Sequence, residues 1–256
     1  MTDEVQLQIL RSGGMVLTAL IVVGLQSALP HAALRGSLRV NGPLWFFNTL
    51  LLAAVCGACG CEMARYAQAG GFGLLNVVPL PGAADAVLTV LVLDFVSYVW
   101  HRANHRLPLL WRFHRVHHSD IDFTVSTGLR FHAGELLLSL PLRLAAVALL
   151  GPPVEAVVAF EILFNFSNLF EHGNIDLPLG LERSVERVFV TPALHRRHHT
   201  RRRPDLDSNY ATIFSFWDRG LGTLRHCTSA DHIDTGLPGI ERSLSFLQAM
   251  KLPFVK

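Results

Sequence analysis

The sequence has few charged residues and few cysteines. Only 16% of its 256 residues are Asp, Glu, Lys or Arg, whereas half are apolar; an average soluble domain is about 25% charged. This composition excludes a disordered chain and a coiled coil. The formal net charge of +2 excludes a nucleic-acid binder that relies on phosphate contacts, and four cysteines are too few for a disulfide framework. The composition is that of a membrane protein.

Long apolar runs predict membrane helices. A straight span needs about 20 residues, so one of the runs is comfortably long and the others are marginal. The last two meet at the helix-breaking Gly151-Pro152-Pro153 and predict a hairpin that either crosses the bilayer or only enters it. We therefore expect an all-α integral membrane protein with four to five apolar helices. The runs occupy residues 14–30, 43–64, 83–100, 134–150 and 153–170.

Cationic residues predict the orientation of the chain. Either form of the hairpin returns the chain to its starting side, which places residues 101–133 and those after about 171 on one face. These segments hold seventeen of the twenty-two cationic residues, and loops rich in Lys and Arg face the cytoplasm. We expect a cytoplasmic helical cap. Twenty Arg against two Lys is typical of a high-GC bacterial genome and favours a bacterial inner membrane.

Histidine is unusually abundant, with thirteen residues, and nine of them form four groups on the expected cytoplasmic side. Positions i, i+3 and i+4 of a helix share one face, so each group presents its imidazoles together. Neutral imidazole suits Fe, Zn, Cu and Ni, and one metal accepts four to six ligands, so nine histidines predict two metal ions. The groups are His101-x3-His105, His114-x2-His117-His118, His172 and His195-x2-His198-His199.

The histidines allow other interpretations. A lone histidine is more often a structural residue than a ligand, and His31, His226 and His232 are interpreted in this way. A haem-binding electron carrier would pair its histidines across spans near the middle of the bilayer. A metal transporter would carry ligands within several spans, whereas a zinc-binding scaffold needs only a closed ligand set. Clustering of the histidines after the helices disfavours the haem carrier and the transporter.

Further motifs accompany the histidines along the chain. They are Asp94-Phe-Val-Ser-Tyr-Val-Trp-His101, Leu110-Trp-Arg-Phe-His114, Arg130-Phe-His132-Ala-Gly-Glu135, Phe170-Glu-His172-Gly-Asn174, Val190-Thr-Pro-Ala-Leu-His195, Asn209-Tyr210 and Trp217-Asp-Arg-Gly-Leu-Gly-Thr223. Over residues 85–225 this series resembles the fatty acid hydroxylase and sterol desaturase superfamily of integral-membrane di-iron oxygenases.

The resemblance implies a reaction of O2 with a lipid. Two iron ions would activate O2 for hydrogen abstraction from an unactivated C–H bond, which leads to hydroxylation or desaturation. Electrons would come from a separate cytochrome b5-like or ferredoxin-like donor. N-terminal membrane helices over 1–82 and a catalytic domain over 83–256 would form one folding unit. The implied iron ligands are His101, His105, His114, His117, His118, His172, His195, His198 and His199.

Other residues are predicted to support these ligands. Asn168 stands where relatives often have a histidine, so it is either a tenth ligand or a neighbour of the ligands. Asp94 lies two helical turns before His101, where a carboxylate can orient a ligand through its second ring nitrogen. Asp207 and Asn209 match family positions near the ligands, although loop capping uses the same residue types. His132 is also predicted to lie near the ligands, but a polar turn before the fourth apolar run explains this residue equally well.

Overall fold

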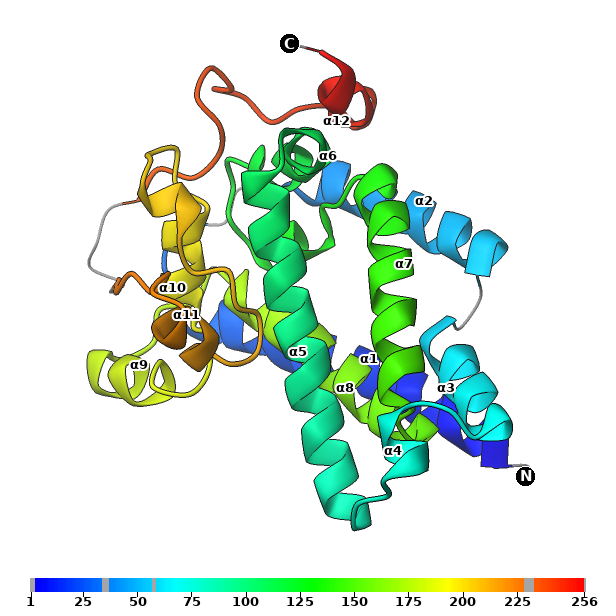
Figure 1. The fold of residues 1–256 in the computed structure, drawn as a ribbon. Helices are drawn as coiled ribbons and strands as arrows, with labels where there is room; N and C mark the ends of the chain where they lie inside the picture. Colours follow the sequence, from blue (N-terminus) through cyan, green and yellow to red (C-terminus); the bar gives the residue numbers. More distant parts are fainter. Residues whose placement is uncertain (1–2, 34–36, 57–58, 228–232, 256) are drawn as a thin grey trace.

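The computed structural model describes residues 3–33, 37–56, 59–227 and 233–255, and Figure 1 shows its helices. Within these ranges no β-sheet forms, and the prediction of an all-α fold is confirmed. The α-helices are α1 (Asp3–Ala28), α2 (Leu38–Cys56), α3 (Cys59–Gly70), α4 (Leu74–Val77), α5 (Gly82–Arg106), α6 (Pro108–His118), α7 (Ala133–Leu150), α8 (Val154–Glu171), α9 (Leu179–Val185), α10 (Pro192–His198), α11 (Phe216–Gly220) and α12 (Phe246–Lys251), and the 3-10 turns are η1 (Val125–Leu129), η2 (Asp205–Asp207) and η3 (Leu252–Phe254).

Four segments of the described chain are long and apolar enough to cross a membrane. They include α1, α5 and α7, and the fourth runs from Leu38 to Val77 through α2 and α3, with residues 57–58 outside the described part. The outer faces of these helices expose large apolar side chains such as Leu20, Phe46 and Leu149, as expected of surfaces that contact lipid tails. The fifth predicted run forms α8, which carries three glutamates and is not among the four.

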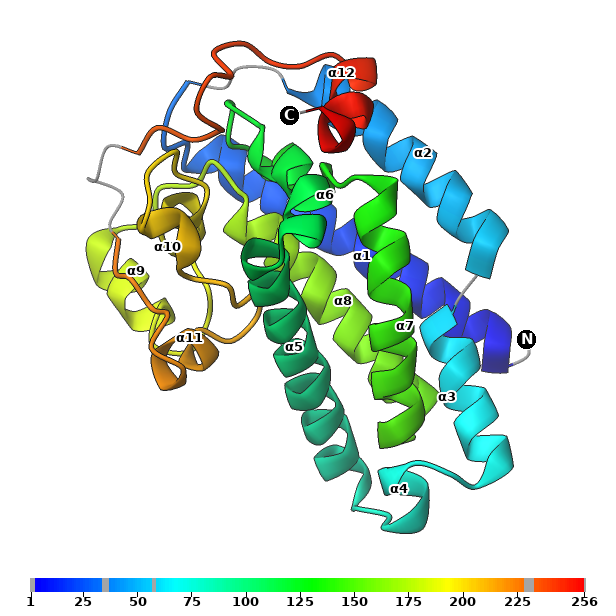
Figure 2. The same cartoon turned by 45° about the horizontal axis from the view of Figure 1, so that its top comes forward.

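Helix α8 is the central element of the helical core. Figure 2 shows α1 running along α8, and α5 also packs against it. A Cβ atom on Gly14 would lie 2.7 Å from Cδ1 of Ile162, so α1 and α8 approach closely at this glycine. An ion pair between Arg11 Nε and Glu161 Oε2, 2.5 Å apart, joins the same two helices. The N-terminal helices thus pack on the remainder of the chain, whereas the domain boundary at 82/83 stays a prediction.

The corner between α7 and α8 is held by a contact between two glycines. Gly151 has a φ of 63° and Gly73 a φ of 93°, a region that only glycine adopts without strain. A Cβ atom on Gly73 would lie 2.6 Å from the backbone Cα of Gly151. Asn76 Nδ2 donates a hydrogen bond to the Gly151 carbonyl at 3.1 Å, so the loop before α4 fastens this corner.

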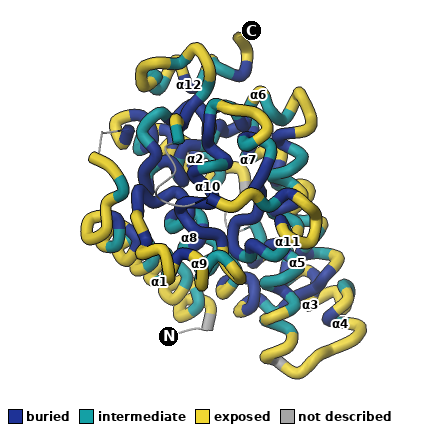
Figure 3. The backbone as a smooth tube through the Cα atoms, turned by 90° about the vertical axis from the view of Figure 1, so that its left-hand side faces the viewer, coloured by how far each residue is buried: buried dark blue, intermediate teal, exposed yellow. Residues whose placement is uncertain are grey.

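The polar cap is built at the other end of α5. Helix α6 follows α5 after a single residue, and α10 packs against the end of α8. Figure 3 shows that the chain around α8 and α10 is largely buried, whereas α9 and α4 are largely exposed. The C-terminal α12 packs on α2, and η3 packs on α6. This arrangement brings the ends of α5, α6, α8 and α10 together.

The glycine contact predicts a stability effect. Replacing Gly73 with Ala places a methyl group against the Gly151 backbone and forces a left-handed φ on a residue with a Cβ, so we expect a loss of about 2 kcal/mol or more. Unfolding of the chain in detergent micelles measures it. Gly180→Ala is the matched control because no atom lies within 4 Å of its Cβ position, and it should leave stability equal or slightly higher. Equal stability of the two variants would contradict the assigned role of the contact.

Candidate metal centre

The structure gathers the nine predicted ligand histidines into two clusters. Within each cluster, one ligand nitrogen from every ring lies within 4.8 Å of the others, and all the residues except His101 are buried. The first cluster comprises His101, His105, His114, His118 and His198. The second cluster comprises His117, His172, His195 and His199. Each set is of a size that one transition-metal ion accepts.

Each H-x-x-H-H motif contributes to both clusters. On α6 the i, i+4 pair His114 and His118 faces the first cluster, and the intervening His117 faces the second. At α10 the i, i+4 pair His195 and His199 belongs to the second cluster, and His198 belongs to the first. Helical spacing therefore explains how two copies of one motif serve two adjacent sites.

The second cluster has the spacing of ligands around a single ion. Nε2 of His172 lies 3.1 Å from Nε2 of His117 and 3.0 Å from Nε2 of His195. Nε2 of His199 lies 3.2 Å from Nε2 of His195. Two nitrogens bound at right angles with metal–nitrogen bonds of about 2.1 Å stand about 3.0 Å apart. The four nitrogens therefore fit one bound metal.

The first cluster holds nitrogens that have no protein partner. Nε2 of His114 and His118 are 3.2 Å apart. Nε2 of His101, Nε2 of His198 and both ring nitrogens of His105 are buried without a hydrogen bond in the described residues. An unsatisfied buried nitrogen is costly, and such groups require an explanation. A metal ion satisfies them, so the first cluster also fits a bound metal.

Hydrogen bonds orient several of the rings. A ligand histidine usually donates its second ring N–H to a carbonyl or a carboxylate, which fixes the tautomer. Three histidines donate from Nδ1 to backbone carbonyls, which leaves Nε2 as the ligand atom. The bonds are His101 to Tyr210 at 2.8 Å, His198 to Ser208 at 2.6 Å and His172 to Asn168 at 2.6 Å.

Burial favours the neutral form of several imidazoles in the cap. Desolvation is the largest cause in every case, and it lowers the pKa of His172 and of His198 to about 3. Neutral imidazole is the form that binds a metal, so these rings are ready to bind at neutral pH. Burial also lowers the pKa of His117, His118, His195 and His199 well below the usual value.

Two buried glutamates lie beside the clusters. Glu135 Oε1 accepts hydrogen bonds from His114 Nδ1 at 2.9 Å and from Asn104 Nδ2 at 3.1 Å. Glu171 Oε2 lies 3.6 Å from His195 Nδ1. The sequence placed Glu135 only in a polar turn and did not single out Glu171. Glu171 could have been identified from the sequence, because it is an acidic residue directly before the predicted ligand His172, at the end of an apolar run.

Two predicted neighbours of the ligands lie close to them. Asn168 contacts His172 through its backbone carbonyl, while its side-chain Nδ2 donates to the Gly128 carbonyl at 2.9 Å. A ligand role for its amide oxygen stays a prediction. Asp207 Oδ1 lies 3.7 Å from His105 Nδ1. Both residues are therefore placed to influence a ligand ring from outside the clusters.

Three other predicted neighbours hold the surrounding backbone. Asp94 accepts from the backbone N–H groups of residues 213 and 214 and from the Trp217 indole at 2.9 Å. Asn209, at a φ of 51°, donates to the carbonyls of residues 194 and 225. His132 caps α7 by accepting from the Gly134 N–H at 2.9 Å, as the polar-turn interpretation expects. Asp94 and Asn209 thus position the loop whose Tyr210 carbonyl orients His101.

Arg130 is a supporting residue that the histidine spacing did not reveal. Its guanidinium is fully buried and donates to the Val116 carbonyl at 2.9 Å, to Asn41 Oδ1 at 2.8 Å and to Ser119 Oγ at 2.9 Å. These bonds satisfy the last turn of α6 and tie it to α2. Arg130 therefore fixes the helix that carries three of the ligand histidines.

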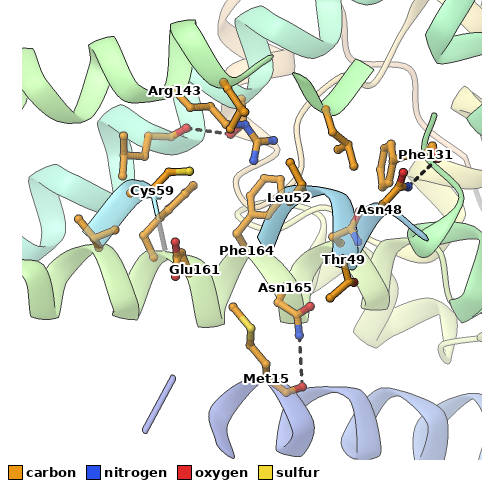
Figure 4. Close-up of a pocket in the computed structure, with 18 of the residues that line it drawn as sticks. Met15, Asn48, Thr49, Leu52, Cys59, Phe131, Arg143, Glu161, Phe164 and Asn165 are labelled. Atoms are coloured by element: carbon orange, nitrogen blue, oxygen red, sulfur yellow. Dashed lines mark hydrogen bonds between the residues drawn. The ribbon is translucent and has the colours of Figure 1, made fainter. Parts of the chain in front are cut away.

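A cavity of about 160 Å³ adjoins the histidines and continues into a larger one of about 420 Å³. The larger cavity lies among α1, α2, α5, α7 and α8 and is lined mainly by apolar side chains such as Leu93, Leu140 and Phe160. Figure 4 shows part of its wall, with Leu52 and Phe164 facing the interior. Both cavities are lined by Ser97, Phe131, Leu136, Arg143, Phe164 and Asn168.

Membrane-capable helices that carry paired histidine clusters beside an apolar cavity are the features of an integral-membrane protein that can hold metal ions at these clusters. The profile of the fatty acid hydroxylase family matches residues 86–223, which is more than half of the chain. The chain belongs to the fatty acid hydroxylase family, and the resemblance seen in the motifs is confirmed.

Relatives of known activity are lipid hydroxylases and monooxygenases. The chain is 32% identical to an ornithine lipid hydroxylase of Rhizobium tropici, over 68% of this chain and 51% of the relative. It is 34% identical to alkylglycerol monooxygenase of Homo sapiens over 51% and 28%, and 28% identical to cholesterol 25-hydroxylase of Rattus norvegicus over 56% and 47%. The chain thus spans about half the length of these relatives or less. No solved structure gives a significant match.

The two-cluster geometry predicts how metal binding responds to a single substitution. His172→Ala removes one of the four nitrogens of the second cluster and leaves the first intact, so we expect the metal content to fall from about two ions per chain to about one. Elemental analysis of the purified chain measures this. His226→Ala is the control, since His226 is 69% exposed at its side chain, and it should keep the full content. Unchanged metal content in His172→Ala would refute a metal site in the second cluster.

The Glu135 hydrogen bond predicts a selective effect on the first cluster. In Glu135→Gln an uncharged amide replaces the carboxylate that holds the His114 ring. Mutation of a residue that hydrogen-bonds a metal ligand costs about 10- to 100-fold in metal affinity. Equilibrium metal titration should show this loss for one of two binding events. Glu155→Gln, at an exposed position at the start of α8, should bind both ions normally. Equal weakening of both metal-binding events would mean that Glu135 supports the whole fold and not the His114 ring in particular.

Proposed function

We propose that this protein is an O2-dependent membrane di-iron oxygenase that hydroxylates an unactivated C–H bond of a lipid. The observation that carries this proposal is that nine histidines, eight of them buried, gather beside a cavity that adjoins the larger apolar one. The family membership supports the reaction class. Hydroxylation is preferred to desaturation because the relatives named above are hydroxylases and monooxygenases.

The ligand set favours two iron ions. The first cluster offers five imidazoles and the second offers four, with Asn168 as a proposed tenth ligand or neighbour. Nitrogen-rich ligation suits a redox-active transition metal better than a hard cation. When bound, the iron pair would activate O2 for removal of a hydrogen atom from the substrate.

The protein's own residues would bind the lipid chain and keep water away from it. The apolar lining of the larger cavity suits an acyl or other hydrocarbon chain, and its volume is in the usual range for ligand pockets. The ring of Phe131 lines both cavities and stacks on His117 at 4.7 Å between centroids. This contact would hold a ligand ring in place and direct the chain toward the histidines. A dry, fixed path also limits side reactions of the oxidant.

The electron donor is proposed to be a separate cytochrome b5-like or ferredoxin-like protein. Trp111 lies between the cap surface and the first cluster, with its ring centroid 5.0 Å from that of His105 and 5.5 Å from that of His118. An aromatic ring in this position offers a short route for electrons to the metals. We propose that the cap faces the cytoplasm of a bacterial cell, as the distribution of Arg and Lys suggests.

The geometry disfavours the haem-binding electron carrier and the metal transporter. Axial histidines of a haem stand on opposite faces of a flat ring, whereas the imidazoles here converge within each cluster with nitrogens 3.0 to 3.2 Å apart. A transport route would distribute ligands along several spans, whereas these histidines gather at the ends of α5, α6, α8 and α10.

Comparing the lipids of a host that expresses the chain with those of a host that expresses His117→Ala/His118→Ala tests the function. This double variant removes one ligand from each cluster. With O2 and a donor present, we expect a lipid that has gained one oxygen atom only with the wild-type chain. A product that has lost two hydrogen atoms would assign desaturation instead. Identical lipids in both hosts would refute the oxygenase proposal.

A further inference from the structure

Arg143 is a cation in the cavity wall that lacks a partner. It lies on α7 and lines both cavities. Its guanidinium carbon lies 5.7 Å from the centroid of the Phe164 ring. In the part of the chain that the structure describes, no hydrogen bond or ion pair joins Arg143 to another residue.

The side chain of Arg143 is exposed, and it lies on the face of α7 that lines the cavity. The residues of α7 that line the larger cavity recur at helical spacing and form one face of the helix. Figure 4 shows the guanidinium reaching over Phe164 inside this cavity. The cavity-lining residues of α7 are Leu136, Leu140, Arg143, Leu144 and Val147.

The other charged and amide groups of the larger cavity have partners. Arg11 and Glu161 neutralise each other in their ion pair. Asn165 Nδ2 donates to Thr18 Oγ1 at 2.7 Å. The charged residues of this lining are Arg11, Glu161 and Arg143. Glu135 and Glu161 act on Arg143 electrostatically, but in the described residues neither carboxylate forms an ion pair or a hydrogen bond with its guanidinium, so the N–H donors of Arg143 are open to a ligand.

The depth of Arg143 makes this charge costly. Ten residues separate it from the start of α7, which corresponds to about 15 Å along the helix axis, and α7 is one of the membrane-capable helices. An arginine at membrane depth is expensive unless it is paired, and such residues mark ligand paths. A guanidinium binds carboxylate and phosphate oxygens through two parallel hydrogen bonds.

We propose that Arg143 binds a carboxylate or phosphate group of the lipid substrate. The hydrocarbon chain of this substrate occupies the larger cavity, and its anionic group sits at the junction with the histidine cavity. The carbon atoms nearest the anionic group then lie closest to the metal centre, so oxidation takes place near the polar end of the lipid. The site of oxidation rests on the proposed function, whereas recognition of the anion does not.

A displacement experiment tests the recognition without any turnover. Radiolabelled oleate is bound to the purified, metal-loaded full-length chain in a neutral detergent, at a pH at which the carboxylate is ionised. Unlabelled oleate, its uncharged methyl ester and oleoyl lysophosphatidate then compete for the site. We expect the wild-type chain to prefer one or both anionic competitors over methyl oleate by about tenfold or more, the range of a hydrogen bond to a charged group. The stronger anionic competitor distinguishes carboxylate from phosphate.

Variants assign the preference to the guanidinium. Arg143→Met keeps an unbranched, though shorter, side chain and removes the charge and the N–H donors, and we expect it to bind methyl oleate and the anions equally. Arg143→Lys keeps the charge and should retain part of the preference. Arg242→Met makes the same substitution at an exposed arginine that lines neither cavity, and it should behave as the wild type does. Thermal unfolding of each variant verifies that the chain is folded.

The outcomes separate this inference from the proposed function. Equal binding of oleate, lysophosphatidate and methyl oleate by the wild-type chain would overturn the inference. An anion preference that survives in folded Arg143→Met would also overturn it. A preference that depends on Arg143, in a chain that oxidises no lipid, would support the inference and count against the oxygenase.

Discussion

The site depends on the need of buried imidazole nitrogens for a partner. Nine histidines converge in a region that water barely reaches, and each ring has two nitrogens that require a hydrogen bond or a metal. Backbone carbonyls and Glu135 satisfy the outer nitrogen of four rings. The inner nitrogens face one another, which is unfavourable without a cation between them. The helices around the site are therefore arranged for a state in which metal is bound.

Local spacing made the grouping of the histidines predictable from the sequence, whereas their role as ligands stays a prediction. His114 and His118 share a helix face because they are four residues apart, and the same rule pairs His195 with His199. The assignment of the histidines to two separate clusters did not follow from spacing. It depends on the angle at which α6 and α10 approach each other, which is a property of the tertiary packing. The all-helical fold was predictable for a similar reason, since long apolar runs leave few alternatives in a membrane.

Residues that act over long sequence separations were harder to predict. Arg130 joins the end of α6 to Asn41 on α2, a residue 89 positions away in the sequence. Asp94 lies two turns from His101, which suggested a direct contact, but it holds backbone groups more than a hundred positions later. Glu171 is next to a ligand in sequence, yet its carboxylate approaches His195. In each case the partner is brought close by the packing of separate helices, and no local pattern encodes it.

The placement of consecutive histidines in different clusters has a consequence for the two ions. His117 is followed directly by His118, and His198 by His199, and each neighbouring pair divides between the clusters. The Cα atoms of adjacent residues are held about 3.8 Å apart by the peptide bond. Covalent geometry at two points of the chain thus limits how far apart the two clusters can lie, and it would set the separation of any two ions bound in them.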